Sequence, residues 1–249
     1  MINEKQLVAY VTSGLPDNNF TIDLCLSMAE NGVDMIELGV PFSDPVADGP
    51  VIEKANHLAL SRGVKFNDIK TITQAISAHV DTLWMGYFNS FYHQGMEMLL
   101  PHAKEIGLKG MIIPDLPHEE AKAYNQLFLE NDLANIAFVA PTDSDARVKE
   151  VVAYAKKFIY MVAYAGITGS GQKEELSGLI ESVKSHSQTP VFVGFGVNEK
   201  TAKEKVQGVD GVIVGSAFVD ILLKDNLSNT QKIEDISALA KEIKDKINH

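Results

Sequence analysis

The strongest candidates for chemistry in this chain lie around a short apolar run that predicts a buried strand. Glu37 stands between Ile36 and Leu38 near the end of that run. A carboxylate in such a place loses hydration, which is costly unless the group is paired, protonated or used. Desolvation also raises the pKa of a carboxyl group, as a general acid or base working near neutral pH requires. Glu37 is therefore predicted to be an acid/base group; the alternative is a charged strand end that simply reaches water.

The loop that follows, Val40–Pro50, carries a second candidate carboxyl group. Three prolines and a glycine stiffen this loop, and Asp44 and Asp48 stand in turn contexts, where aspartate is most often structural. Asp48, however, belongs to the loop that leaves the strand end where Glu37 stands. The two carboxyl groups are therefore predicted to share one pocket, where different surroundings would give them different protonation states.

Short apolar runs recur along the whole chain and alternate with amphipathic stretches. The predicted strands are Gln6–Thr12, Asp34–Leu38, Thr82–Met85, Gly110–Pro114, Asn135–Ala140, Phe158–Val162, Pro190–Gly194 and Gly211–Val214. The predicted helices include Asn18–Glu30, Phe66–Ala78, Gly95–Ile106, Glu119–Glu130, Ala146–Ala155 and Glu174–Ser185. Several strands are apolar without alternation, which is typical of parallel strands buried on both faces, and the helices repeat apolar residues three or four apart.

This alternation predicts an α/β fold, a single-domain (β/α)8 TIM barrel that spans residues 1–249. Eight strand–helix units in 249 residues give roughly 30 residues per unit, the size found in such barrels. The competing fold is an open doubly wound sheet. No G-x-G-x-x-G pattern follows the first strand, where the sequence is Thr12-Ser13-Gly14-Leu15-Pro16, and this favours the barrel.

Charge and composition exclude several classes of function. The 22 basic and 33 acidic residues give a net charge of −11, so nucleic acid and anionic membranes are unfavourable partners. Any bound phosphate must then be held by backbone amides or a few local donors. The only cysteine, Cys25, can form no internal disulfide, and the seven histidines show no metal-binding spacing. Without an apolar secretory signal or a membrane-length apolar run, a cytoplasmic protein that binds no metal is expected.

One segment carries a specific family resemblance. Residues 37 to 50, Glu-Leu-Gly-Val-Pro-Phe-Ser-Asp-Pro-Val-Ala-Asp-Gly-Pro, resemble the signature of the tryptophan synthase alpha subunit family. Further matching motifs follow later strands in the same order, at Pro114–Pro117, Gly166–Gly169, Gly194–Val197 and Gly215–Ala217. The resemblance therefore spans nearly the whole chain. Departures from the family pattern are Tyr10 where phenylalanine is common, Leu15 in place of an aspartate, and no helix before the first strand.

The resemblance implies a carbon–carbon lyase of L-tryptophan biosynthesis. Members of the family cleave indole-3-glycerol phosphate to indole and glyceraldehyde 3-phosphate by a retro-aldol reaction on a (β/α)8 barrel. By similarity, Glu37 moves the protons, while Asp48 accepts the indole N–H and stabilises positive charge in the transition state. Tyr160 corresponds to a family tyrosine that contacts the substrate near the reacting carbons, although a half-buried core tyrosine would look the same.

The implied substrate has an aromatic end and a phosphate end. The predicted indole slot is lined by Tyr10, Tyr87, Ile112, Phe195 and Ile213. Thr168, in the segment Gly166–Leu176, is expected to touch the catalytic aspartate when that segment closes over the substrate. The predicted phosphate ligands are Gly169, Gly196, Gly215 and Ser216, because glycine-rich loops after the last two strands let backbone N–H groups approach an anion.

The resemblance also implies a partner. Family alpha subunits pair with a beta subunit that uses pyridoxal phosphate and receives indole through a tunnel, in an alpha2beta2 complex. The expected contact residues are Pro41, Asp44, Pro45 and Asp115, and this chain itself is expected to need no cofactor. Two other hypotheses stay open: a regulatory subunit that binds the partner but turns over poorly alone, and a free-standing lyase without a partner.

Overall fold

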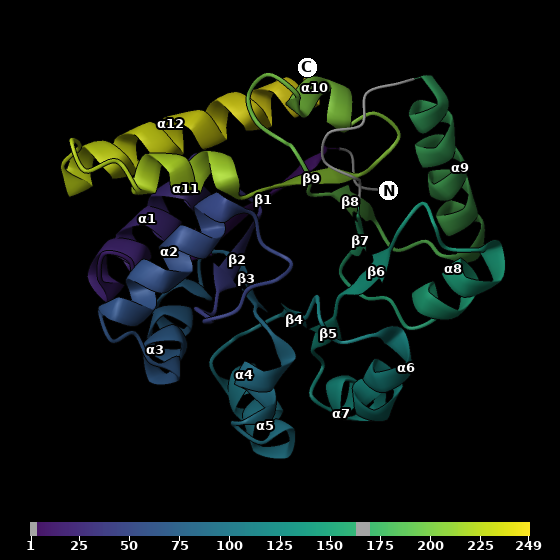
Figure 1. Ribbon diagram of the computed structural model, residues 1–249, viewed down its shortest axis with the longest axis horizontal. Helices are drawn as coiled ribbons and strands as arrows, with labels where there is room; N and C mark the ends of the chain where they lie inside the picture. The colour runs from purple at the N-terminus through teal and green to yellow at the C-terminus, as the bar shows by residue number, and fades with distance from the viewer. Residues whose placement is uncertain (1–3, 163–169) are drawn as a thin grey trace.

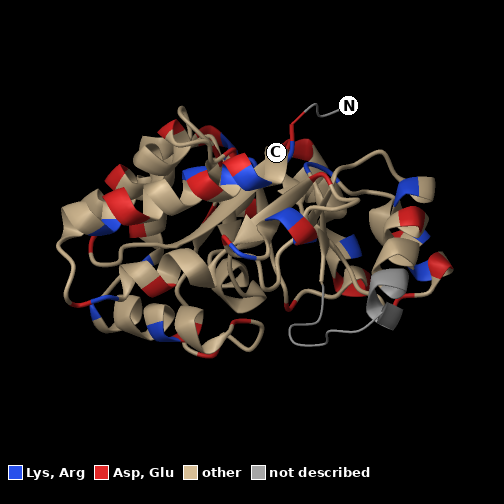
Figure 2. Ribbon diagram, turned by 90° about the horizontal axis from the view of Figure 1, so that it is seen from above, with Lys and Arg blue, Asp and Glu red and all other residues tan. Residues whose placement is uncertain are grey.

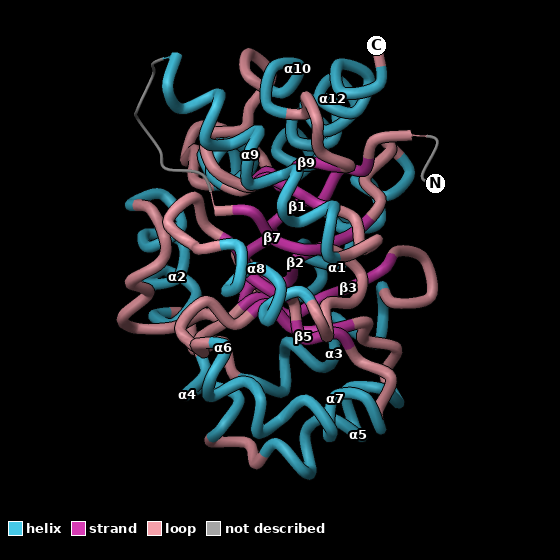
Figure 3. Tube along the Cα trace, turned by 90° about the vertical axis from the view of Figure 1, so that its right-hand side faces the viewer, coloured by secondary structure: helices cyan, strands magenta, loops and turns pink. Residues whose placement is uncertain are grey.

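The computed structural model describes residues 4–162 and 170–249 and confirms the TIM-barrel prediction (Figure 1). Parallel strands form the centre of the molecule and helices surround them (Figure 3). The strands are β1 (Gln6–Thr12), β2 (Met35–Gly39), β3 (Asp81–Met85), β4 (Gly110–Ile112), β5 (Ala134–Asn135), β6 (Ala137–Val139), β7 (Ile159–Met161), β8 (Val191–Val193) and β9 (Gly211–Val214).

The nine strand segments correspond to the eight predicted strands, because one predicted strand is interrupted. The expected strand Asn135–Ala140 appears as β5 and β6, separated by Ile136. The sheet order is β5-β4-β3-β2-β1-β9-β8-β7-β6. β5 pairs with β4, and β6 pairs with β7. Since β5 and β6 are the two halves of one stretch of chain, the sheet returns to its starting point and closes into a barrel.

Helices cover the outside of this sheet. They are α1 (Asn18–Glu30), α2 (Pro50–Ser61), α3 (Phe66–Ile76), α4 (Phe88–Tyr92), α5 (Met96–Glu105), α6 (His118–Ala121), the 3₁₀ turn η1 (Lys122–Tyr124), α7 (Asn125–Glu130), α8 (Asp145–Val152), α9 (Ser170–His186), α10 (Ala202–Lys205), α11 (Ser216–Leu222) and α12 (Asn229–Asn248). The predicted helix Glu119–Glu130 was wrong as a single element, because the chain tightens at η1 between α6 and α7. Within the described residues, no helix combines the length and apolarity needed to cross a bilayer.

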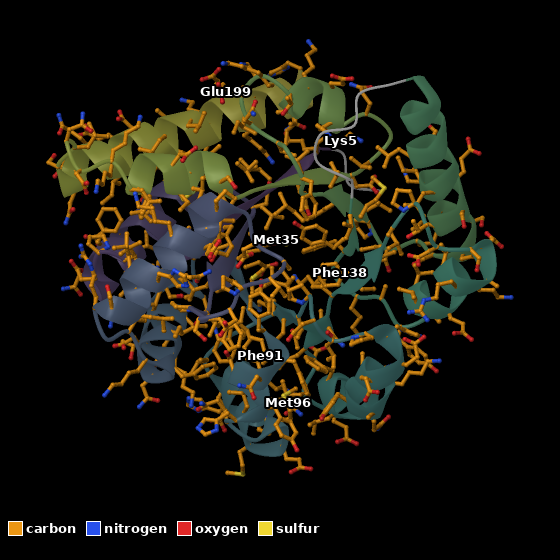
Figure 4. The ribbon with its side chains drawn as sticks, in the orientation of Figure 1. Lys5, Met35, Phe91, Met96, Phe138 and Glu199 are labelled. Atoms are coloured by element: carbon orange, nitrogen blue, oxygen red, sulfur yellow. The ribbon has the colours of Figure 1, made fainter. Side chains whose placement is uncertain are left out.

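Two apolar layers explain why the strands carry little alternation. One layer fills the barrel lumen, and its side chains come from successive strands around the ring: Val8, Met35, Leu83, Ile112, Phe158, Phe192 and Ile213. Met35 and Phe138 lie near the centre of the barrel in Figure 4. The other layer packs the outer face of the sheet against the helices. Each strand is therefore buried on both faces, as in other all-parallel sheets.

The last helix, α12, joins the C-terminal part of the chain to α1 and to the start of β2. Lys244 Nζ donates to Asp34 Oδ2 at 2.7 Å, and the same oxygen accepts from the Leu7 backbone N at 2.7 Å. Ser237 on α12 also hydrogen-bonds Ser27 on α1 at 2.8 Å. On the outer helices, Lys and Arg alternate with Asp and Glu instead of gathering on one face (Figure 2).

A buried hydrogen bond joins β3 to α3 in the outer layer. The Trp84 indole Nε1 donates to Thr73 Oγ1 at 2.8 Å, and both residues are fully buried. Thr73 Oγ1 in turn donates to the Ile69 carbonyl at 2.8 Å. The indole N–H therefore has a single side-chain acceptor and no access to water.

Replacing that acceptor is expected to destabilise the fold. Thr73→Val should lower the free energy of unfolding by about 1–3 kcal/mol, because the Trp84 N–H is left buried without an acceptor. Urea-induced unfolding measures the change. Thr71→Val is the matched control, since the exposed Thr71 hydroxyl bonds only the Asn67 carbonyl of its own helix. Equal losses in the two variants would contradict the role given to Thr73.

Candidate active site

Glu37 lies in the barrel lumen beside Tyr10. The two residues are partners in the β1–β2 register, and Glu37 is two residues beyond the lumen residue Met35, so its side chain faces inward. Its exposed fraction is 3%, and its Oε1 atom has no hydrogen-bond partner among the described residues. Desolvation, with a smaller contribution from the charge of Asp48, raises the pKa of Glu37 to about 8. Glu37 therefore carries a proton at neutral pH.

Asp48 lies near the end of the loop between β2 and α2, and its carboxyl group comes close to that of Glu37. Its backbone N donates to the Pro45 carbonyl at 2.9 Å, which closes a turn. Asn56 on α2 donates from Nδ2 to Asp48 Oδ2 at 3.3 Å. Burial raises the pKa of Asp48 to about 6, although hydrogen bonds from Tyr87 and Asn56 favour the ionised form. Near neutral pH the site therefore holds one protonated and one ionised carboxyl group.

Tyr87, at the end of β3, holds this loop at three points. Its hydroxyl accepts from the Ala47 backbone N at 2.9 Å and hydrogen-bonds the Asp48 carboxylate. Its ring stacks on Phe42, with ring centroids 5.0 Å apart. The position of Asp48 is thus fixed by a residue from the neighbouring strand. Sequence analysis predicted Tyr87 only as part of the indole slot.

Two glycines make room for two tyrosines in the lumen. A Cβ atom at Gly39 would overlap the Tyr10 hydroxyl, and one at Gly194 would overlap the Tyr160 hydroxyl. Burial raises the pKa of Tyr160 above its ordinary value, and the charges of Glu37 and Asp48 raise it further. Both phenols therefore stay protonated, and Tyr160 lies within electrostatic range of both carboxyl groups.

A cavity of about 600 Å³ opens after β8 and β9, and we call it the glycine-loop cavity. Gly196, Gly215 and Ser216 line it, as does Glu199, which is labelled in Figure 4. The backbone N–H groups of Gly196 and Ser216 have no acceptor among the described residues. None of the described residues that line the cavity is Lys or Arg. An anion here would have to be held by backbone amides, and the φ of +68° at Gly196 requires glycine.

The remaining predicted substrate residues fall into three groups. Phe195 is half-buried and meets the Tyr160 ring edge-on, with centroids 6.4 Å apart. Ile112 and Ile213 pack in the lumen cluster; Ile213 is level with Val8 and so lies one layer below Tyr10. Thr168 and Gly169 lie outside the described residues.

The four residues expected to contact the partner differ in exposure. Pro41 and Pro45 are buried within the chain, because the loop folds its prolines inward against its own barrel. Their place in the partner contact stays a prediction. Asp44 and Asp115 are exposed, and Val46 is 85% exposed. The Asp115 carboxylate also accepts from the Phe88 backbone N at 2.7 Å, which fixes its position at the start of α4.

Asn56 is the site residue that sequence analysis missed. It is buried on α2, and its Oδ1 atom has no partner among the described residues. A lone asparagine carries little signal, but Pro50 after Gly49 could have marked the start of α2, since proline favours the first position of a helix.

The raised pKa of Glu37 makes a prediction about stability. The ordinary pKa of 4.5 becomes about 8 in the folded chain, so the folded state keeps a proton that the unfolded state releases. Stability must then fall as pH rises through this window. Glu37→Gln removes the free-energy cost of keeping this carboxyl group protonated in the fold. The variant should therefore have a higher free energy of unfolding, by on the order of 3 kcal/mol at pH 7 and by less at pH 5.

Urea-induced unfolding of both proteins at the two pH values tests this expectation. Glu30→Gln, at an exposed carboxyl group on α1, is the matched control and should show neither the gain nor its pH dependence. A gain of the same size at both pH values would show that the Glu37 carboxyl group is not protonated in the fold.

Comparison with known proteins agrees with this geometry. A family model described as tryptophan synthase alpha chain matches residues 1–248. The tryptophan synthase alpha chain of Wolinella succinogenes is 54% identical over 249 residues, covering 100% of this chain and 98% of that protein. A crystal structure of ligand-free tryptophan synthase from M. tuberculosis superposes with a TM-score of 0.88 at 32% identity, over 99% of this chain and 94% of that one. The alpha subunit from Legionella pneumophila gives 0.87 at 29% identity, over 98% and 92%. The chain therefore belongs to the tryptophan synthase alpha chain family.

Proposed function

We propose that Glu37 and Asp48 together perform the reaction of this family. The chain is a carbon–carbon lyase of L-tryptophan biosynthesis that cleaves indole-3-glycerol phosphate to indole and glyceraldehyde 3-phosphate. The observation that carries the assignment of roles is the pairing of a buried, protonated Glu37 with an ionised Asp48 in one lumen. One group can give a proton while the other accepts a hydrogen bond and stabilises positive charge.

The two groups act at different atoms of the substrate. Glu37 gives its proton to indole C3, and the ring nitrogen becomes positively charged. Asp48 accepts the indole N–H and stabilises that charge, an interaction stronger in the transition state than in the ground state. The carbon–carbon bond then breaks, its electrons return to the ring, and the side-chain hydroxyl loses its proton to become the aldehyde. Glu37, now a carboxylate, takes that proton and is restored.

The rest of the lumen supports this arrangement of the substrate. Tyr10, Tyr160 and Phe195 offer aromatic surface next to Glu37, which suits a planar indole. The phosphate would lie in the glycine-loop cavity on the free N–H groups of Gly196 and Ser216. The unpartnered Glu37 Oε1 and Asn56 Oδ1 are buried polar atoms of the kind that a polar substrate satisfies.

We also propose the beta subunit, with its pyridoxal phosphate, as the partner, in an alpha2beta2 complex located in the cytoplasm. Asp44, Val46 and Asp115 supply exposed surface on the two loops expected to meet it. Val46 supports this role because a large apolar side chain left 85% exposed on a well-anchored loop favours a covering protein. Tyr87 would link that surface to the Asp48 carboxylate.

Removing the acid from position 37 tests the assignment directly. Glu37→Gln should lower kcat for indole release by roughly 10²–10⁴-fold, because the amide cannot transfer the proton. In the unmutated chain, kcat/KM should fall as pH rises above about 8, where Glu37 loses its proton. Indole formation is measured for the chain alone and with the beta subunit. Glu30→Gln is the control, and unchanged turnover in Glu37→Gln would remove Glu37 from the mechanism.

Tyr87 is a positioning residue, and the role of its hydroxyl can be tested through the pH dependence of kcat/KM. Tyr87→Phe removes a hydrogen bond that favours ionised Asp48, so the acid limb of the kcat/KM profile, expected near pH 6, should move to higher pH. The fall in kcat should exceed any rise in KM. Tyr92→Phe on α4 is the matched control, since that side chain is 61% exposed. An unmoved acid limb in Tyr87→Phe would contradict the role.

A further inference from the structure

A second cavity lies on the flank of the barrel, away from the glycine loops. Its volume is about 200 Å³, and it is bounded by α6 and α7 on one side, α8 on the other, and β5–β6 beneath. We call it the α7–α8 cavity. This volume is below the range of drug-sized ligand pockets, so only a small molecule of one or two rings would fit.

Polar atoms make up more of the lining of this cavity than apolar atoms, and its walls include two aromatic rings. Phe128 comes from α7, and Tyr154 follows the end of α8 by two residues. Tyr154 is 60% exposed, so one side of the cavity is open to entry. Phe138, labelled in Figure 4, also borders the cavity, but its ring lies on the lumen side and stacks on Tyr160 with centroids 5.1 Å apart. Flat aromatic surfaces of this kind favour a planar ligand.

Three polar side chains that line the cavity are without hydrogen-bond partners among the described residues. They are Asn125 on α7, Asn135 on β5 and His118 at the start of α6. The His118 Nε2 atom is buried, and burial together with the charges of Lys122 and Arg147 lowers the pKa of this histidine. A neutral imidazole and two amides can each form a hydrogen bond with a ligand that carries both a donor and an acceptor.

The basic side chains that line the cavity are already paired. Arg147 pairs with Glu119, and Lys156 pairs with Asp132 at 3.6 Å. The Asp143 carboxylate accepts from the Ala140 backbone N at 2.7 Å. Asp143 keeps its negative charge, and no basic side chain that lines the cavity is left unpaired to hold an anion. An anionic ligand is therefore unfavourable, and a neutral ligand is favoured over it.

We propose that the α7–α8 cavity is a second binding site, which takes a small, neutral, planar nitrogen heterocycle recognised by His118, Asn125 and Asn135. This site does not depend on the roles given to Glu37 and Asp48. The ligand packs against the aromatic walls and satisfies the polar side chains that the protein leaves unpaired. Ala137 on β6 lines the cavity and faces the helix layer, so its small side chain keeps the space open.

Benzimidazole is a suitable probe because it is planar and has one N–H donor and one nitrogen acceptor. Amide NMR of the full chain, at mildly alkaline pH where the probe is neutral, should show saturable shifts on α6–α8 with a Kd on the order of 1 mM. Indane, which has the same outline without nitrogen, should bind at least about tenfold more weakly. Shifts confined to the barrel lumen, or equal binding of both probes, would overturn the proposal.

Two variants localise the binding. Ala137→Met fills the cavity and should abolish the shifts on α6–α8, whereas Ala123→Met, at an exposed position outside the cavity, should leave them unchanged. Asn135→Leu keeps the side-chain size and should weaken benzimidazole about tenfold while leaving the weak binding of indane in place. The Asn135→Leu test remains valid even if the Ala137→Met protein fails to fold. Unchanged benzimidazole affinity in Asn135→Leu therefore also contradicts the proposal.

Discussion

The cost of burying a carboxyl group governs the chemistry of this barrel. Glu37 has almost no contact with water, and no cation among the described residues pairs with it. The lumen can enclose it because the group keeps its proton, as do the phenols of Tyr10 and Tyr160 beside it. Asp48, placed at the rim, is then the group that carries charge near neutral pH. An acid and an anion thus arise from two carboxyl groups through their different burial.

The position of that anion depends on elements that are distant in the sequence. Asp48 belongs to a loop after β2, but its partners are Asn56 on α2 and Tyr87 at the end of β3. Tyr87 also meets Phe42 and the Ala47 N–H, so the loop rests on a rigid strand end. The adjacent Phe88 N–H contacts the Asp115 carboxylate after β4. Loops around three strand ends are therefore mechanically connected at the face where a partner is proposed.

Much of the fold could be predicted because short apolar runs identify buried strands whatever they pair with. β1 and β9 begin and end where predicted, and the number of barrel strands was right. The interruption at Ile136 was not predictable, since it depends on β4 and β7 drawing the two halves of one strand to opposite sides. The helix α12 was not among the predicted helices, although Ser228 and Gln231 form a capping box at its start.

The sequence by itself determined the residue types, their order and the family, because a signature such as residues 37–50 needs no knowledge of contacts. The sequence also predicted that Glu37 and Asp48 lie at one strand end, and in the structure the two carboxyl groups are close enough to affect each other's ionisation. Only the tertiary structure decided that Pro41 and Pro45 face inward and that Asn56 supports Asp48. Burial and hydrogen bonding are properties of neighbours in space, and those neighbours come from other strands and helices.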